Sequence, residues 1–198
     1  MEVNEISKKY CDKKYNKAEE ILSLTHDFGK YTTFFQKYIL SKDESKNELN
    51  GHGFISALFG AFIALDFYGD NSIMPAIIYS CILHHHGSIK SIDINLPKDF
   101  KAPVIDRPDL RDKVDIAYEQ MKDIEKNKEF IESDYEKLGY SKYFNEFITE
   151  KPFKKILNTL RKIQRGFDHH NKSEETYFVN QMLYSSLIAA DKISASNI

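Results

Sequence analysis

Tryptophan is absent from this chain of 198 residues, cysteine occurs only twice, and neither sign of charge is in large excess. Cys11 and Cys81 form no Cys-x-x-Cys pair, so the sequence shows neither a disulfide framework nor a thiolate zinc motif. The formal net charge of -2 indicates no bulk attraction to nucleic acid, although it leaves room for a local basic patch.

Long hydrophobic runs are also missing. The apolar stretches are interrupted and shorter than the roughly 20 residues that a membrane helix needs. Residues 1–15 are charged and contain no apolar signal core. With 41% hydrophobic residues, the chain has the composition of a globular domain. We therefore expect residues 1–198 to form a single domain of a soluble cytoplasmic protein that makes no membrane contact.

Helical periodicity dominates the sequence, and no alternating pattern predicts a strand. Residues 54–68 and 73–83 are apolar almost all the way round, which is typical of helices in the middle of a core. Further apolar stripes predict helices over 18–25, 108–138, 152–163 and 177–190, while residues 87–106 read as a long loop. The sequence predicts an all-α bundle of about six or seven helices, with boundaries good to roughly ±2–4 residues.

One face of the helix that begins at Pro152 is basic. It carries Lys151, Lys154, Lys155, Arg161, Lys162 and Arg165. This face is a candidate track for a nucleic-acid backbone. A solvated lysine surface explains it equally well.

Five of the seven histidines stand where predicted core helices begin or end. His26 follows the helix over 18–25, His52 precedes the helix over 54–68, and His84, His85 and His86 end the next helix. Asp191 ends the last apolar helix. Imidazole nitrogens and carboxylate oxygens gathered in a helical bundle suit Mn, Fe, Co, Ni or Zn. A metal also offsets the cost of burying the carboxylate.

Each of these residues also has an ordinary interpretation. His52 between two glycines can be a turn or capping residue, and Asp191 can be a helix-end acid in a salt bridge. The three consecutive histidines cannot all point the same way on a helix. His169 and His170 are expected as an exposed pair in a loop, although they could replace a missing ligand. Cys81 is expected to pack in the core.

His26-Asp27-Phe28-Gly29-Lys30 resembles the signature of the HD phosphohydrolase superfamily. The further order Gly51-His52-Gly53, His85-His86-Gly87 and Ala190-Asp191-Lys192 is similar to one branch, the HD nuclease of type I CRISPR interference. The resemblance covers about residues 18–196 and implies an all-α bundle of the HD type. The paired histidines before Gly87 are its most specific feature, and they imply two metal ions.

The resemblance assigns roles to particular residues. Asp27 bridges both metals, His26 and Asp191 bind the first, and His52, His85 and His86 bind the second. His84 is the alternative if the register shifts by one residue. Lys30 lies beside the scissile phosphate, and Ser194 or Ser196 joins a polar shell behind Asp191. The family pattern also includes a first-metal histidine upstream of the His-Asp pair, whereas this sequence has no histidine before His26.

The activity implied by the resemblance is cleavage of single-stranded DNA. A water activated by two divalent ions (Mn, Ni, Co, Fe or Mg) would hydrolyse the phosphodiester. The sequence contains no P-loop or nucleophile elbow. Strand unwinding would therefore need a separate CRISPR-associated helicase and an RNA-guided surveillance complex as partners.

Three other functions remain open. An HD nucleotidase or deoxynucleotide triphosphohydrolase shares the His-Asp pair and the distal aspartate, but explains the His-His-Gly pair less well. A non-catalytic interaction module that keeps a metal for stability would fit the missing upstream histidine. A cyclic-nucleotide phosphodiesterase is more distant. Activity on a polymer, release of phosphate from mononucleotides, or neither, distinguishes the main alternatives.

Overall fold

The computed structural model describes residues 2–41, 47–99, 107–170 and 174–196, with the backbone alone for 168–170. These residues form ten α-helices and four 3-10 helices, and none of them is in a strand. The α-helices are α1 (Glu2–Tyr10), α2 (Asn16–Thr25), α3 (Thr33–Ser41), α4 (Gly53–Tyr68), α5 (Met74–Leu83), α6 (Pro108–Lys126), α7 (Lys128–Lys137), α8 (Ser141–Glu150), α9 (Phe153–His170) and α10 (Glu174–Ser196). The 3-10 helices are η1 (Lys13–Tyr15), η2 (Phe28–Tyr31), η3 (Glu48–Asn50) and η4 (Ile92–Asn95). The prediction of an all-α helical bundle is confirmed.

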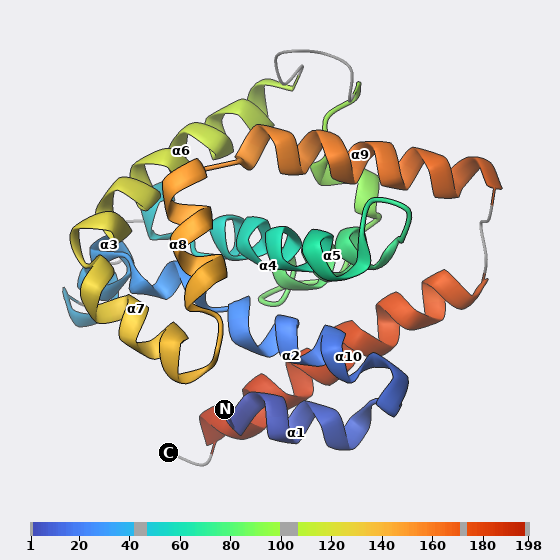
Figure 1. Ribbon diagram of the computed structural model, residues 1–198, viewed down its shortest axis with the longest axis horizontal. Helices are drawn as coiled ribbons and strands as arrows, with labels where there is room; N and C mark the ends of the chain where they lie inside the picture. Colours follow the sequence, from blue (N-terminus) through green and yellow to red (C-terminus); the bar gives the residue numbers. More distant parts are fainter. Residues whose placement is uncertain (1, 42–46, 100–106, 171–173, 197–198) are drawn as a thin grey trace.

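The helices α4 and α5 form the centre of the bundle (Figure 1). Contacts with α2, α6, α8 and α9 surround α4, and α2, α9 and α10 pack against α5. Because neighbours cover most of their surface, neither helix needs a polar face, and most of their residues are buried. Their prediction as core helices is confirmed.

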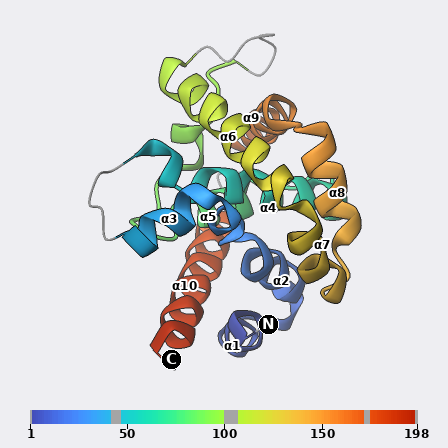
Figure 2. The ribbon, with the colours of Figure 1, turned by 90° about the vertical axis from the view of Figure 1, so that its left-hand side faces the viewer.

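The remaining helices enclose this central pair. The first and last helices, α1 and α10, pack against each other, so the two termini lie close together at one edge of the bundle (Figures 1 and 2). On the opposite edge α9 runs across α4 and α5. This arrangement brings the C-terminal ends of α2 and α5 and the N-terminal end of α4 to one place, where the predicted ligands lie.

The structure differs from the sequence prediction in several helices. Three helices, α1, α3 and α8, were not predicted; each is only nine or ten residues long and buries at most three of them. The predicted helix over 108–138 is two helices that meet at Asn127. The predicted loop over 87–106 contains η4, and its residues 100–106 lie outside the described part of the chain.

Among the described residues, no helix combines the length and the apolar character needed to cross a lipid bilayer.

Glu19 of α2 is fully buried between α1 and α10. Neither of its carboxylate oxygens has a hydrogen-bond partner in the described part of the chain. Burial raises the pKa of Glu19 above its ordinary value, and the nearby polar groups of Cys11, Ser186 and Ser7 offset this only in part. The folded protein therefore retains a proton on Glu19 at pH values where the unfolded chain has lost it.

We expect Glu19→Gln to increase the stability of the protein at neutral pH. A raised pKa in the folded state means that stability falls as pH rises from the unfolded pKa towards the folded pKa, and stays reduced above it. Glutamine does not ionise, so the variant avoids this loss. Removing the desolvation cost should raise the free energy of unfolding by about 1–3 kcal/mol at about pH 8. At about pH 4 the gain should be absent. Urea unfolding at the two pH values measures both.

The neighbouring Glu20 provides a control, because its substitution should change the stability in the opposite direction. Burial raises the pKa of Glu20, but hydrogen bonds from Tyr140 and Lys17 lower it by more, so its net pKa is lowered. Glu20→Gln should therefore lose stability at neutral pH, and the loss should disappear in acid. Equal effects of Glu19→Gln at both pH values would show that the buried charge is not the cause.

Candidate metal centre

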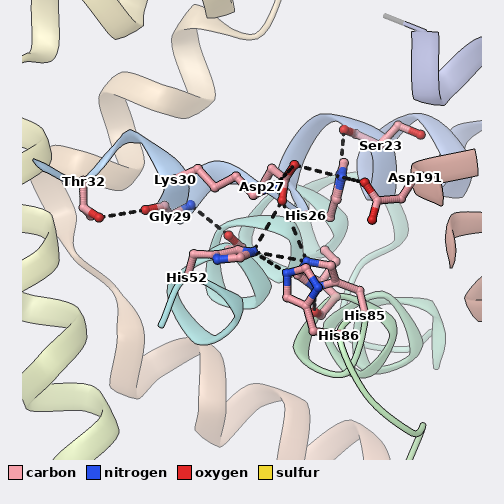
Figure 3. Close-up of polar contacts among 12 residues, drawn as sticks. Ser23, His26, Asp27, Gly29, Lys30, Thr32, His52, His85, His86 and Asp191 are labelled. Atoms are coloured by element: carbon pink, nitrogen blue, oxygen red, sulfur yellow. Dashed lines mark hydrogen bonds and ion pairs between the residues drawn. The ribbon is translucent and has the colours of Figure 1, made fainter. Parts of the chain in front are cut away.

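The His26-Asp27 pair lies in the turn between α2 and η2. The backbone N–H of His26 donates to the carbonyl of Leu22 at 3.0 Å, which completes the last turn of α2. Phe28 then enters the core, where its ring centroid lies 4.5 Å from that of Phe59. Burial of Phe28 anchors the turn, and the side chains of His26 and Asp27 extend towards the other candidate ligands (Figure 3).

Gly29 allows this turn to pack closely against the start of α4. Its N–H donates to Ser56 Oγ at 2.9 Å. A Cβ at this position would lie 2.7 Å from both the Cβ and the carbonyl oxygen of His52, so only glycine fits without a shift. The close approach leaves Asp27 Oδ1 3.4 Å from His52 Nε2. The glycine of the His-Asp-x-Gly-Lys string therefore places two candidate ligands together.

The three consecutive histidines lie in a turn after α5, which lets them point in different directions. His85 Nε2 lies 3.3 Å from His52 Nε2, and His86 Nε2 lies 2.7 Å from the same atom. His84 is directed elsewhere, with its Nε2 3.2 Å from Asn95 Nδ2. The alternative register with His84 as a ligand is therefore wrong for this structure.

Two groups of ligand atoms result, and they share Asp27. The histidine-rich group consists of Asp27, His52, His85 and His86, and the acidic group consists of His26, Asp27 and Asp191. Within each group the ligand atoms lie within 4.8 Å of one another. Asp27 Oδ1 faces the histidine-rich group, while Oδ2 lies 3.3 Å from His26 Nε2 (Figure 3). All six residues predicted as metal ligands meet here, although their binding of metal stays a prediction.

Hydrogen bonds at the outer ring nitrogens support the role of the histidines as ligands. His26 Nδ1 donates to the carbonyl of Ser23 at 3.0 Å, and His85 Nδ1 donates to the carbonyl of Ile82 at 2.6 Å. A carbonyl only accepts, so each Nδ1 carries a proton, and each ring in its neutral form presents the lone pair of Nε2 to the cluster. Metal-binding histidines are held in this way.

The inward-facing atoms also fit a cation. His26 Nε2 and Asp27 Oδ1 are buried, and neither has a hydrogen-bond partner among the described residues. Ligands around a tetrahedral ion with bonds near 2.1 Å stand about 3.4 Å apart. The distances from Asp27 Oδ1 to His52 Nε2 and from His26 Nε2 to Asp191 Oδ1 are 3.4 and 3.6 Å. The cluster can hold a metal ion.

The electrostatics of the cluster are consistent with this chemistry. Burial lowers the pKa of His85 to about 4, so its ring is neutral at neutral pH. Burial raises the pKa of Asp27, but His26 and His52 outweigh it and hold the pKa well below its usual range. Burial lowers the pKa of His26, while Asp191 and Asp27 raise it to about 9. A proton and a metal ion therefore compete for His26 Nε2.

Lys30 reaches the same cluster from η2. Its Nζ lies 2.8 Å from Asp27 Oδ2, and about a third of its side chain is exposed. The lysine therefore stands at the open edge of the cluster, next to the carboxylate shared by both ligand groups. Its contact with a substrate stays a prediction.

Several other sequence predictions need correction. Asp191 lies inside α10 and not at its end, because no helix breaker follows it before Ser196. Ser194 Oγ bonds to Glu2 Oε2 at 3.0 Å and Ser196 Oγ bonds to the carbonyl of Ile193, so neither supports Asp191. The backbone of His169 and His170 belongs to α9 and not to a loop, and their side chains lie outside the described part. The burial of Cys81 is confirmed.

Sequence reasoning missed Gln120, a buried residue of α6. Its Nε2 donates to the carbonyls of Leu49 and Gly51 at 2.9 and 2.7 Å, and so fixes the backbone directly before His52. Three residues on, Asp123 accepts hydrogen bonds from the N–H and hydroxyl of Thr33. Two polar residues within the otherwise apolar stripe of α6 were the available signal, but their partners lie far away in the sequence.

We expect Gln120→Glu to weaken metal binding without removing a ligand. A carboxylate cannot donate, so the segment before His52 should move away from the two carbonyls. Loss of such outer support typically costs about 10–100-fold in metal affinity. Titration calorimetry with Mn²⁺ measures the change. Gln36→Glu is the matched control, because its single bond to the Lys30 carbonyl is exposed and water can replace it. Unchanged affinity in Gln120→Glu would contradict the positioning role.

Comparison of the chain with protein-family models, curated proteins and solved structures gives no match. The geometry of the cluster and the sequence motifs are therefore the observations that indicate a function.

Proposed function

We propose that this chain is a metal-dependent phosphohydrolase of the HD type, and that it cleaves single-stranded DNA in type I CRISPR interference. The observation that carries the proposal is the pair of ligand groups that share Asp27. An aspartate between two sets of imidazole and carboxylate ligands is an arrangement suited to two neighbouring ions, which is typical of enzymes that hydrolyse phosphodiesters. The resemblance of the His26–Lys30 string to the HD signature supports the same class.

The chain's own residues have distinct roles in this proposal. His52, His85 and His86 would hold one divalent ion (Mn, Ni, Co, Fe or Mg), and His26 and Asp191 would hold the other. When bound, the ions activate a water for attack and offset the charge of the phosphate oxygens. Lys30 Nζ, at the exposed edge of the cluster, offers a further cation to the phosphate.

The basic face near α9 gives less support than its composition suggests. Lys151 pairs with Glu125 at 2.8 Å, and Lys162 pairs with Asp70 at 3.0 Å. Arg161 and Arg165 both donate to the carbonyl of Lys98. Much of this face therefore stabilises contacts within the protein. We place the scissile phosphate at the metal centre and base no binding track on α9.

A nucleotidase is the second candidate. The observation in its favour is a cleft beside His52 and His86 that a single nucleotide could occupy.

If the protein is a nuclease, a separate helicase and an RNA-guided complex would supply its single-stranded DNA.

The test is degradation of circular and linear single-stranded DNA with added Mn²⁺, Ni²⁺, Co²⁺ or Mg²⁺, with EDTA as the negative control. We expect metal-dependent cleavage of both substrates, and cleavage of the circle would identify an endonuclease. Asp27→Asn should abolish it. Absence of cleavage with every metal, in a folded protein, would overturn the nuclease proposal. Phosphate release from mononucleotides would then support the nucleotidase.

A further inference from the structure

A cleft of about 590 Å³ opens next to the histidine-rich group, between α6 and the adjoining ends of α4 and α5. His52 and His86 line both the metal centre and the cleft. A group that is covalently attached to a phosphate at the metal centre can therefore enter the cleft directly. Its volume falls within the range of about 300–1,000 Å³ that is usual for small-ligand sites.

The inner walls of this cleft are largely apolar. Phe54 from α4, Leu83 from α5 and Ile116 from α6 are half-buried and contribute to the lining. Gln120 also lines the cleft, but both of its amide hydrogens are directed at backbone carbonyls. Such walls favour a flat, weakly polar group over a strongly hydrated one.

The charged side chains among the described lining residues are mostly carboxylates. They are the exposed Glu48, Asp109 and Asp112, together with the cation Lys113. Arg107, which is not part of the lining, pairs with Asp109 at 2.7 Å. Carboxylates repel a second phosphate, so this lining favours an uncharged portion of a substrate.

We infer that this cleft is a nucleoside subsite, which receives the base and sugar attached to the phosphate bound at the metal centre. The inference rests on the proposed phosphohydrolase function and specifies its substrate as a nucleotide unit. Phe54 and Ile116 provide apolar surface for the faces of the base. The shared lining residues His52 and His86 place the attached phosphate beside the ligand group.

The test compares two phosphodiesters with the same leaving group. These are the 4-nitrophenyl ester of thymidine 5′-phosphate and methyl 4-nitrophenyl phosphate, which differ only in thymidine against methyl. Ile116→Trp fills the cleft from the half-buried face of α6. Asp115→Trp, at an exposed neighbouring position outside the lining, is the matched control. Circular dichroism and thermal unfolding establish that both variants are folded.

We expect kcat/KM for the thymidine ester to exceed that for the methyl ester by at least about tenfold, because binding of the nucleoside contributes to the transition state. Ile116→Trp should lower the value for the thymidine ester alone, and Asp115→Trp should leave the ratio unchanged. Equal hydrolysis of both esters by the wild-type protein would overturn the subsite and leave the phosphohydrolase proposal intact.

A protein that lacks phosphohydrolase activity would give a different result. If neither ester is hydrolysed with any metal, the proposed function fails, and titration with thymidine monophosphate and inorganic phosphate then tests the cleft alone. Tighter binding of thymidine monophosphate that Ile116→Trp removes would support the subsite, and equal binding would overturn it. If hydrolysis occurs, competition by thymidine monophosphate and by oligothymidylate identifies a free nucleotide or a polymer as the preferred source of the nucleoside.

Discussion

Asp27→Asn should abolish metal-dependent hydrolysis and weaken metal binding at both ligand groups. Asp27 Oδ1 faces His52 and His85, and Oδ2 faces His26, so one substitution replaces the carboxylate shared by both groups with a neutral amide that offers a single oxygen. Loss of the ions removes several kcal/mol of transition-state stabilisation, which corresponds to a decrease of about 10³-fold or more in rate. Titration calorimetry and metal analysis of the purified protein measure the binding, and phosphodiester cleavage measures the rate.

The matched control for Asp27→Asn is Asp191→Asn. Asp191 belongs to the acidic group alone, with Oδ1 3.6 Å from His26 Nε2. Its substitution should weaken binding at that group and leave the histidine-rich group intact. If the two variants lost the same amount of metal, Asp27 would not be the residue shared by two sites.

Gly29→Ala should both destabilise the protein and disturb the metal centre. The added Cβ would lie 2.7 Å from the Cβ and carbonyl oxygen of His52 and from Ile55 Cγ2. Two of these atoms belong to the helix start that carries a candidate ligand, so the turn and α4 must separate. Overpacking of this kind costs about 1–3 kcal/mol in the free energy of unfolding. Displacement of His52 from Asp27 should also lower metal affinity by about 10-fold or more.

The same substitution at Gly166 is the control for the loss of a glycine. It separates the steric effect of the added Cβ from the effect of replacing glycine by alanine. Gly166 lies within α9, and a Cβ there meets nothing within 4 Å. Gly166→Ala should raise the free energy of unfolding by about 0.5–1 kcal/mol, since alanine loses less backbone entropy in a helix. Urea unfolding and Mn²⁺ titration test both variants. Wild-type metal affinity in Gly29→Ala would show that the close approach does not position His52.

The candidate histidines were predictable because they stand at the ends of strongly apolar helices. Residues 54–68 and 73–83 are hydrophobic on every side, so histidines at their ends stand out from their surroundings. The string from His26 to Lys30 adds Gly29, which is required because the turn packs closely against the start of α4. Type and spacing marked these residues as candidates, and the resemblance to the HD signature selected the set that the structure brings together.

The choice among His84, His85 and His86 was not available from spacing. Neighbouring residues in a turn diverge, and the hydrogen bond of His85 Nδ1 to Ile82 and the contact of His84 with Asn95 decide which rings face inward. The position of Asp191 inside α10 likewise depends on packing against α1 and α2, which continues the helix beyond it. Such contacts join residues far apart in the chain.

The sequence by itself determined the all-α class, the central helices α2, α4 and α5, and the residue types of the candidate metal centre. Hydrophobic periodicity is a local property, and it is strong where a helix is buried on most of its surface. Only the tertiary structure decided the two ligand groups that share Asp27, the support of His52 by Gln120 and the cleft beside His86. Each of these depends on distances between separate helices, which no single segment encodes.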